Sequence, residues 1–230
     1  MKPVIGIVTR PQLRENGLRI DTVTNMARRS VLKNGGIPIG ILPSQDVNYF
    51  DLERADIHPL TEEEKDIIIK EINMCDGIIL QGGNRWYEYD EFIVNYIIEN
   101  DIPAIMICMS MQLLNSVDFL NHDMSYILEE VGGHRSDDKY VHEVNIKEDS
   151  ILYKILGKNK INVNSLHRYA IKDTLNYEVI ATSLDGVIEA ISVPNKKFIL
   201  GLQWHPEKMI DYDEDANKII KYFIDITKSH

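Results

Sequence analysis

The sequence predicts an α/β fold: a mixed sheet with a parallel core and an antiparallel extension, covered by helices on both faces. In the first half of the chain, short continuous apolar runs alternate with segments of helical pattern, which is typical of parallel strands buried on both sides. In the second half, strand-like runs follow one another closely, which indicates antiparallel pairing. No repeat, low-complexity tract or flexible linker divides the 230 residues, so we expect one domain over 1–230.

Elements of the first half alternate in type. Thr61 and Glu64 fit a capping box at the start of one helix, in which each residue satisfies a backbone N–H of the other. A glycine pair closes the helix before it, as is common at helix C-termini. The expected strands span 3–9, 37–43, 76–80 and 102–108, and the expected helices span 22–36, 61–74 and 90–100.

The second half is expected to contain mainly strands, followed by a closing helix near 213–227. A segment around 155–160 has a superficial likeness to a phosphate-binding loop, but it lacks the required preceding glycine and following Ser or Thr. A helix that ends at Gly157 explains it better. The expected strands span 140–146, 160–165, 177–183, 187–193 and 197–203.

Composition and charge exclude several classes of function. The formal net charge of −11 argues against non-specific binding to nucleic acid or to an anionic membrane. With only two cysteines, a disulfide framework is not expected. No apolar run approaches the ~20 residues of a membrane span, and the N-terminus lacks the apolar region of a signal peptide. We therefore expect a cytoplasmic setting, while the oligomeric state, including a homo-oligomer, stays open.

Cys108 lies at the junction of an expected buried strand and an amphipathic helix. The free N–H groups and the positive dipole end of a helix N-terminus favour a thiolate there. The alternative is a buried cysteine that acts as a small apolar residue, as most free cysteines do. Position alone does not decide between the two.

Two further segments supply the partners that a cysteine nucleophile needs. A late strand leads to His205, and Glu207 follows two residues later; a histidine base oriented by a carboxylate would complete a triad. Gly82 and Gly83 directly follow another strand. The N–H of Gly83, together with that of Met109, would form an oxyanion hole. Taken singly, an H-x-E pair and a Gly-Gly turn are both common.

Together these motifs resemble the class I glutamine amidotransferase superfamily. Their order along the chain is Gly82-Gly83, then Cys108 with Gln112, then His205-Pro206-Glu207. The segments 163–167 and 183–191 extend the resemblance to the γ-glutamyl hydrolase branch, which includes γ-glutamyl-GABA hydrolase. The resemblance covers nearly the whole chain and implies a flavodoxin-like α/β fold.

The resemblance implies hydrolysis of a γ-glutamyl amide through a thioester on Cys108, without a cofactor. It implies that Gln112 helps to hold the glutamyl group, and that Asn164, Ser165 and His167 form the pocket wall; a hydrogen-bonded turn is the alternative for the last three. The family elbow usually reads Gly-x-Cys-x-Gly, often with an arginine directly after the cysteine. In this chain Met106 and Ser110 stand at the two glycine positions, and Met109 stands at the arginine position.

Arginines occur in several of the expected loops despite the acidic total. Guanidinium groups suit carboxylates and phosphates, so Arg10 and Arg85 are predicted to contact substrate, and an anionic leaving group becomes a hypothesis. A nucleotide-linked substrate such as γ-glutamyl-CDP-amidate, used in capsule phosphoramidate biosynthesis, would fit it. The other loop arginines are Arg14, Arg19, Arg135 and Arg168.

Alternative functions compete with the γ-glutamyl hydrolase hypothesis. No two of His134, His142, His167 and His205 have the close spacing of a zinc motif, so no metal is predicted. A glutaminase subunit that supplies ammonia to a separate synthase is the second enzyme hypothesis. A docking subunit with a decayed site is the non-enzyme hypothesis.

Overall fold

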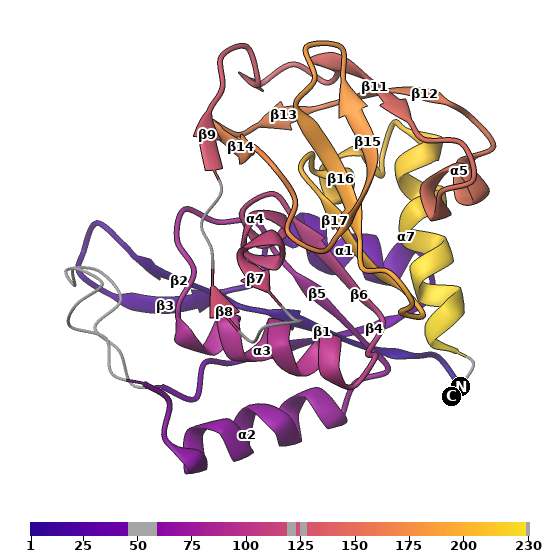
Figure 1. The fold of residues 1–230 in the computed structure, drawn as a ribbon. Helices are drawn as coiled ribbons and strands as arrows, with labels where there is room; N and C mark the ends of the chain where they lie inside the picture. Colours follow the sequence, from indigo (N-terminus) through magenta and orange to yellow (C-terminus); the bar gives the residue numbers. More distant parts are fainter. Residues whose placement is uncertain (46–58, 119–122, 125–127, 229–230) are drawn as a thin grey trace.

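The computed structural model describes residues 1–45, 59–118, 123–124 and 128–228, and its centre is a nine-stranded sheet (Figure 1). The strand order is β12-β11-β15-β16-β17-β6-β5-β1-β4. The parallel strands are β1 (Val4–Val8), β4 (Ile37–Ile41), β5 (Gly77–Leu80), β6 (Ala104–Ile107) and β17 (Ile199–Leu202). Numbered along the chain, these five have the spatial order 2-1-3-4-5, the order of flavodoxin-like folds. The predicted fold class is confirmed.

The antiparallel extension begins at β17, which pairs in parallel with β6 on one side and antiparallel with β16 on the other. A strand from the end of the chain thus lies between the two parts of the sheet. The remaining strands of the extension are β11 (His142–Ile146), β12 (Lys160–Val163), β15 (Glu178–Ser183) and β16 (Ile188–Ser192).

Helices cover both faces of the sheet and bury two apolar clusters. One cluster contains Val31 of α1 and Phe223 of α7, and the other contains Ile72 of α2 and Ile97 of α3. In Figure 1, α2 and α3 lie together below the sheet, and α7 (yellow) lies beside the extension. The helices are α1 (Asn25–Lys33), α2 (Glu62–Asn73), α3 (Glu88–Glu99), α4 (Met109–Ser116), α5 (Ile151–Leu156), α6 (Pro206–Met209) and α7 (Glu214–Thr227). No helix in the described part of the chain is long and apolar enough to cross a membrane.

The predicted helix signals are present as caps. The Thr61 hydroxyl accepts from the N–H of Glu64 at 3.2 Å, and the Glu64 carboxylate accepts from the N–H of Thr61 at 2.7 Å. Gly157 ends α5 in the left-handed conformation, with a φ of 66°. Both predictions are confirmed.

The segment after the first strand differs from the expected loop. It forms a hairpin of β2 (Arg10–Leu13) and β3 (Arg19–Thr22), with Gly17 in the connection at a φ of 78°. Both strands are largely polar and lie outside the main sheet, so the apolar pattern that identifies buried strands is absent. Three other two-stranded ribbons pair β7 (Val117–Asp118) with β8 (Asp123–Met124), β9 (Leu128–Glu130) with β14 (Tyr169–Ile171), and β10 (Arg135–Ser136) with β13 (Ser165–Leu166).

Candidate active site

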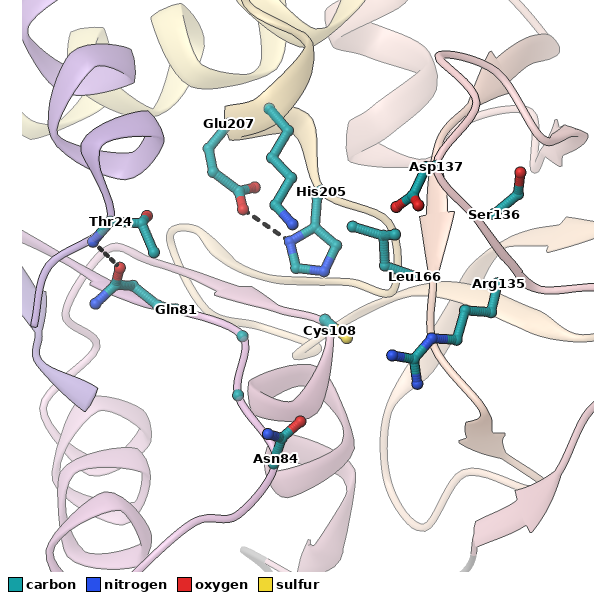
Figure 2. Close-up of a pocket in the computed structure, with 13 residues that line it drawn as sticks. Thr24, Gln81, Asn84, Cys108, Arg135, Ser136, Asp137, Leu166, His205 and Glu207 are labelled. Atoms are coloured by element: carbon teal, nitrogen blue, oxygen red, sulfur yellow. Dashed lines mark hydrogen bonds and ion pairs between the residues drawn. The ribbon is translucent and has the colours of Figure 1, made fainter. Parts of the chain in front are cut away.

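The candidate site lies beyond the carboxyl ends of neighbouring parallel strands. β5 leads to Gly82 and Gly83, β6 to Cys108, and β17 to His205. In sheets of this topology, ligands bind in the crevice outside these strand ends. A cavity of about 580 Å³ opens there, and all four residues contribute to its lining (Figure 2).

Cys108 has a strained backbone, with a φ of 54° and a ψ of −111°. Non-glycine residues rarely occupy this region, and such strain costs about 1–3 kcal/mol and gathers at functional sites. The Cys108 N–H donates to the Leu202 carbonyl at 2.7 Å, and its own carbonyl accepts from Met111 and Gln112 of α4. These bonds hold a sharp strand-to-helix elbow although the usual glycines are missing.

The substitutions around the elbow are accommodated by packing and by hydrogen bonds. Met106 is fully buried in the apolar cluster that also contains Met111, and its neighbour across the β6–β17 pair is Gly201. A Cβ atom at Gly201 would lie 2.9 Å from both Ile191 and Met111, so this glycine leaves room for the side chains packed around β6 and β17. Ser110 donates its hydroxyl to the Gln81 carbonyl at 2.7 Å, which ties α4 to the turn after β5.

Arg10 lies beneath this turn. Its guanidinium donates to the Gln81 carbonyl at 2.8 Å, to the Ser110 hydroxyl at 2.8 Å and to the buried Asp90 carboxylate at 2.5 Å. Its side chain is only 8% exposed. Arg10 therefore connects α3, α4 and the glycine turn, and it also lines a hollow beside the site; its contact with substrate stays a prediction.

His205 and Glu207 form a buried pair. The Nδ1 of His205 lies 2.7 Å from Oε1 of Glu207, which leaves Nε2 as the nitrogen that can exchange a proton with a substrate or a nucleophile. Burial alone would lower the pKa of His205, but the Glu207 carboxylate and a hydrogen bond with Cys108 raise it to about 9. The three predicted catalytic side chains thus come together in one buried group.

Asn164 fixes the backbone of His205. Its side-chain amide donates to the His205 carbonyl at 3.0 Å, and its side-chain carbonyl accepts from the His205 N–H at 2.8 Å. Asn164 was expected in the pocket wall, but it does not contribute to the cavity lining. Its amide is used for positioning the histidine.

Gly82 allows a close approach between the turn and the catalytic group. A Cβ atom at this position would lie 2.9 Å from Cε1 of His205 and 3.3 Å from Cβ of Cys108. A Cβ at Gly83 would lie 3.1 Å from the Met109 side chain. Met109 is the first residue of α4, so its N–H has no acceptor within the helix. Gly83 and Met109 are the predicted oxyanion donors.

Among the residues that the structure describes, three charged ones line the cavity besides the catalytic group: Arg135, Asp137 and Lys208. In Figure 2, the Arg135 side chain reaches from its strand toward Cys108, while Asp137 lies near Leu166. The sequence identifies Arg135 only as one loop arginine among several. It does not predict Asp137 and Lys208 as cavity residues, because single charged residues in polar segments have the same pattern as solvated surface residues.

A second hollow of about 520 Å³ lies on the other side of the glycine turn. It shares Thr24, Gly82, Gly83 and Asn84 with the first. Arg85 is among its lining residues, so the predicted Arg85 lies beside the site rather than against Cys108.

The other predicted substrate ligands do not line the main cavity. Gln112 donates to the Tyr169 carbonyl at 2.7 Å and to the Gln203 side chain at 3.2 Å. Ser165 donates to the His134 carbonyl at 2.6 Å, and His167 faces a separate buried cluster. These contacts hold the elements around the cavity together, and Ser165 and His167 do not take their expected place in its wall. Direct contact of Gln112 with a glutamyl group stays a prediction.

Comparison with known proteins agrees with this geometry. Residues 85–207, which include Cys108, His205 and Glu207, match the Peptidase C26 family. The chain belongs to the Peptidase C26 family. It is 30% identical over 230 residues to the gamma-glutamyl-gamma-aminobutyrate hydrolase of Shigella flexneri, across 89% of this chain and 85% of that protein. It is 29% identical to gamma-glutamyl-gamma-aminobutyrate hydrolase PuuD of Escherichia coli strain K12, with the same coverage.

Solved structures place this Peptidase C26 chain among glutamine amidotransferase folds. The glutaminase domain of a Trypanosoma brucei CTPS, with bound acivicin, superposes with a TM-score of 0.63 at 17% identity, over 98% of this chain and 94% of that one. A glutamine amidotransferase from Thermotoga maritima gives a TM-score of 0.59 at 14% identity, over 99% and 97%. The resemblance to the class I glutamine amidotransferase superfamily is confirmed, and the family and its relatives support a hydrolase.

Proposed function

We propose that this chain hydrolyses a γ-glutamyl amide through a γ-glutamyl thioester on Cys108, with His205 and Glu207 as the rest of a catalytic triad. The observation that carries the proposal is the strained Cys108 elbow beside a histidine whose Nδ1 lies 2.7 Å from Glu207. A core cysteine has no need of a positive φ or of a buried His–Glu pair. The relatives that act on gamma-glutamyl-gamma-aminobutyrate support the same reaction class.

Each residue has a definite task in this mechanism. His205 holds the proton of the Cys108 thiol, and the sulfur bonds to the γ-carbonyl carbon while the C=O electron pair moves onto the oxygen. The N–H groups of Gly83 and Met109 stabilise that oxyanion. The oxyanion then collapses, the C–N bond breaks, and His205 returns its proton to the leaving nitrogen. A water molecule gives a proton to His205 and attacks the thioester carbon; the C–S bond breaks with its electron pair on the Cys108 sulfur, glutamate leaves, and the Cys108–His205 pair again holds the one proton with which it began.

The charges in the cavity support an α-amino-acid substrate. The Arg135 guanidinium and the Lys208 ammonium offer partners for an α-carboxylate, and Asp137 offers one for an α-ammonium group. Arg85, in the adjoining hollow, supports an anionic leaving group. Both γ-glutamyl-GABA and γ-glutamyl-CDP-amidate have one, and the phosphates of the second would extend into this adjoining hollow.

The deciding experiment measures glutamate release by the purified chain on glutamine, γ-glutamyl-GABA and γ-glutamyl-CDP-amidate. We expect turnover of one substituted amide, loss of that turnover in Cys108→Ala, and full activity in Cys75→Ala. Cys75 is a matched control because burial, with the nearby Asp76 and Glu71 carboxylates, raises its pKa to about 12. Equal or better turnover of γ-glutamyl-GABA would exclude the nucleotide-linked substrate.

A glutaminase subunit is the alternative, and the same experiment distinguishes it. The chain is 29% identical to a CTP synthase of Methanosarcina barkeri, matching only 37% of that protein. A chain of this type would be nearly inactive on all three amides alone and would hydrolyse glutamine once its synthase was added. An active Cys108→Ala protein would contradict both functions.

A further inference from the structure

Three histidines and a glutamate converge in a second buried group, separate from Cys108 and His205. We call it the histidine cluster: His134, His142, His167 and Glu189. One nitrogen from each histidine and one carboxylate oxygen lie within 4.8 Å of one another. The Glu189 side chain is fully buried, and that of His142 is the most accessible at 16%.

The atoms that face one another in this cluster lack hydrogen-bond partners among the described residues. Oε1 of Glu189 lies 3.2 Å from Nδ1 of His134, 3.4 Å from Nε2 of His142 and 3.6 Å from Nε2 of His167. None of these four atoms has a hydrogen bond of acceptable geometry. Buried polar atoms are nearly always satisfied, and an isolated buried carboxylate is especially costly.

In His134 and His167, one ring nitrogen faces Glu189 (the inner nitrogen) and the other has a different partner (the outer nitrogen). The contact of the outer nitrogen determines whether the inner nitrogen carries a lone pair. Nε2 of His134 lies 3.0 Å from the Asp185 carboxylate, which is itself held by the Ser183 hydroxyl. Nδ1 of His167 lies 3.1 Å from the Tyr169 carbonyl. Both contacts require an N–H on the outer nitrogen, so in the neutral rings the inner nitrogens are acceptors. Acceptors that point at a carboxylate repel it unless a cation lies between them.

We propose that the histidine cluster binds one divalent transition-metal ion, of which zinc is the best match. Imidazole and carboxylate ligands suit zinc. Tetrahedral Zn–N bonds of about 2.0–2.1 Å separate neighbouring ligand atoms by about 3.3 Å, close to the 3.2–3.6 Å found around Oε1 of Glu189. The Asp185–His134 contact has the form of the carboxylate–histidine pairs that orient metal ligands. Glu189 and Asp185 together balance the charge of a dication.

Four protein ligands leave no open position, so the ion would have a structural role. The cluster joins the β10–β13 ribbon to β16 of the main sheet, since His134 and His167 flank the ribbon and Glu189 lies in β16. The same ribbon carries Arg135 and Leu166 into the lining of the catalytic cavity. The metal would thereby fix one wall of that cavity. This inference does not depend on the proposed reaction.

The experiment uses chain without a polyhistidine tag, produced with zinc in the medium and purified in metal-free buffer. We expect elemental analysis to find one zinc ion per chain. After removal of the metal with a chelator, added Zn²⁺ in thousand-fold excess over its Kd should raise Tm by roughly 10 °C. Added Co²⁺ should give the intense visible absorption of a tetrahedral site.

Variants locate the ion. His142→Gln and Glu189→Gln should each weaken Zn²⁺ binding at least ~100-fold, and His142→Gln is the milder change because that side chain is partly exposed. Cys108→Ala and His205→Gln should bind zinc as the wild type does, which separates this site from the catalytic group whether or not the chain is active on any amide.

Two results would overturn the proposal. One is wild-type chain that contains no metal and, after chelation, binds neither Zn²⁺ nor Co²⁺; the cluster would then be a protonated histidine–carboxylate network. The other is zinc that is retained in both His142→Gln and Glu189→Gln but lost in His205→Gln. The Co²⁺ measurement needs only the wild type, so a variant that fails to fold leaves the test intact.

Discussion

At the scale of single residues, the site depends on the close contact between Gly82 and His205. The turn, the imidazole and the Cys108 elbow are in contact, and there is no room for a methyl group between them. The conformation of Gly82 is open to other residues, since its φ is not positive. Close approach, rather than backbone freedom, is what requires glycine here.

We therefore expect Gly82→Ala to lower kcat/KM about 100-fold, because a displacement of the order of 1 Å at a catalytic group has effects of that size. Steady-state kinetics on the active substrate of the panel would measure it. Gly132→Ala is the control, since a Cβ there meets nothing within 4 Å. Unchanged activity in Gly82→Ala would mean that His205 does not need its observed position.

The charge of His205 leads to a prediction on stability. Its pKa of about 9 in the folded chain lies above the ordinary value of about 6.5 in the unfolded chain. The folded state binds the proton more tightly, so its contribution is complete below pH 6.5 and is lost as the pH rises through 9. The free energy of unfolding should fall by roughly 3 kcal/mol over this interval relative to His205→Gln. Urea denaturation at pH 6.5 and 9.5 measures it, and equal pH dependence in both proteins would refute the assignment.

At the scale of elements, the glycine turn and the elbow are held by a buried ion pair. Arg10, the first residue of β2, reaches Asp90 in α3 and both Gln81 and Ser110. The pair lies inside the protein, with side-chain exposures of 8% and 0%. It fixes α3 and α4 relative to the glycine turn, and this turn lines the cavity.

Asp90→Ala should destabilise the chain by about 3–5 kcal/mol, because it leaves the Arg10 charge buried without its partner. Urea denaturation would measure the loss. The exposed pair between Glu62 and Lys65 is the comparison, and Lys65→Ala should cost less than about 1 kcal/mol. If Arg10 served mainly as a substrate ligand, Arg10→Met would raise KM and leave stability nearly unchanged.

At the scale of the whole molecule, the two parts of the sheet share one strand. β17, from residues near the end of the chain, pairs with β6 of the parallel core and with β16 of the extension. Phe223 of α7 belongs to the same apolar cluster as Ile5 of the core and Ile180 of the extension. Neither part can lose its structure without exposing surface of the other.

We expect unfolding in one cooperative transition, as for a single domain. Fluorescence, in which the fully buried Trp204 contributes, and circular dichroism should give the same midpoint in urea. Phe223→Ala should lower the midpoint by the same amount in both measurements and should lower the free energy of unfolding by about 3–5 kcal/mol. Two separate transitions would show that the extension folds as a domain of its own.

Most of the fold could be predicted from the sequence because its strong signals are local. Buried parallel strands have continuous apolar runs, and caps such as Thr61–Glu64 and Gly157 act over a few residues. The hairpin after β1 and the short ribbons were not predictable in this way. They are small and polar, and their positions depend on neighbours that are distant in the chain.

The sequence by itself determined the α/β class, the order of the elements, and the residues that meet at the strand ends, namely Cys108, His205 and Glu207. Each of these follows from local pattern, or from motifs in a fixed order. Only the tertiary structure decided that Arg10 hydrogen-bonds to the glycine turn and Asn164 to the backbone of His205. It also decided that Arg135 and Lys208 line the cavity. The convergence of three histidines on Glu189 is likewise tertiary; they are His134, His142 and His167. The physical reason is that the direction and partners of a side chain depend on strands brought together from far along the chain, which no local spacing records.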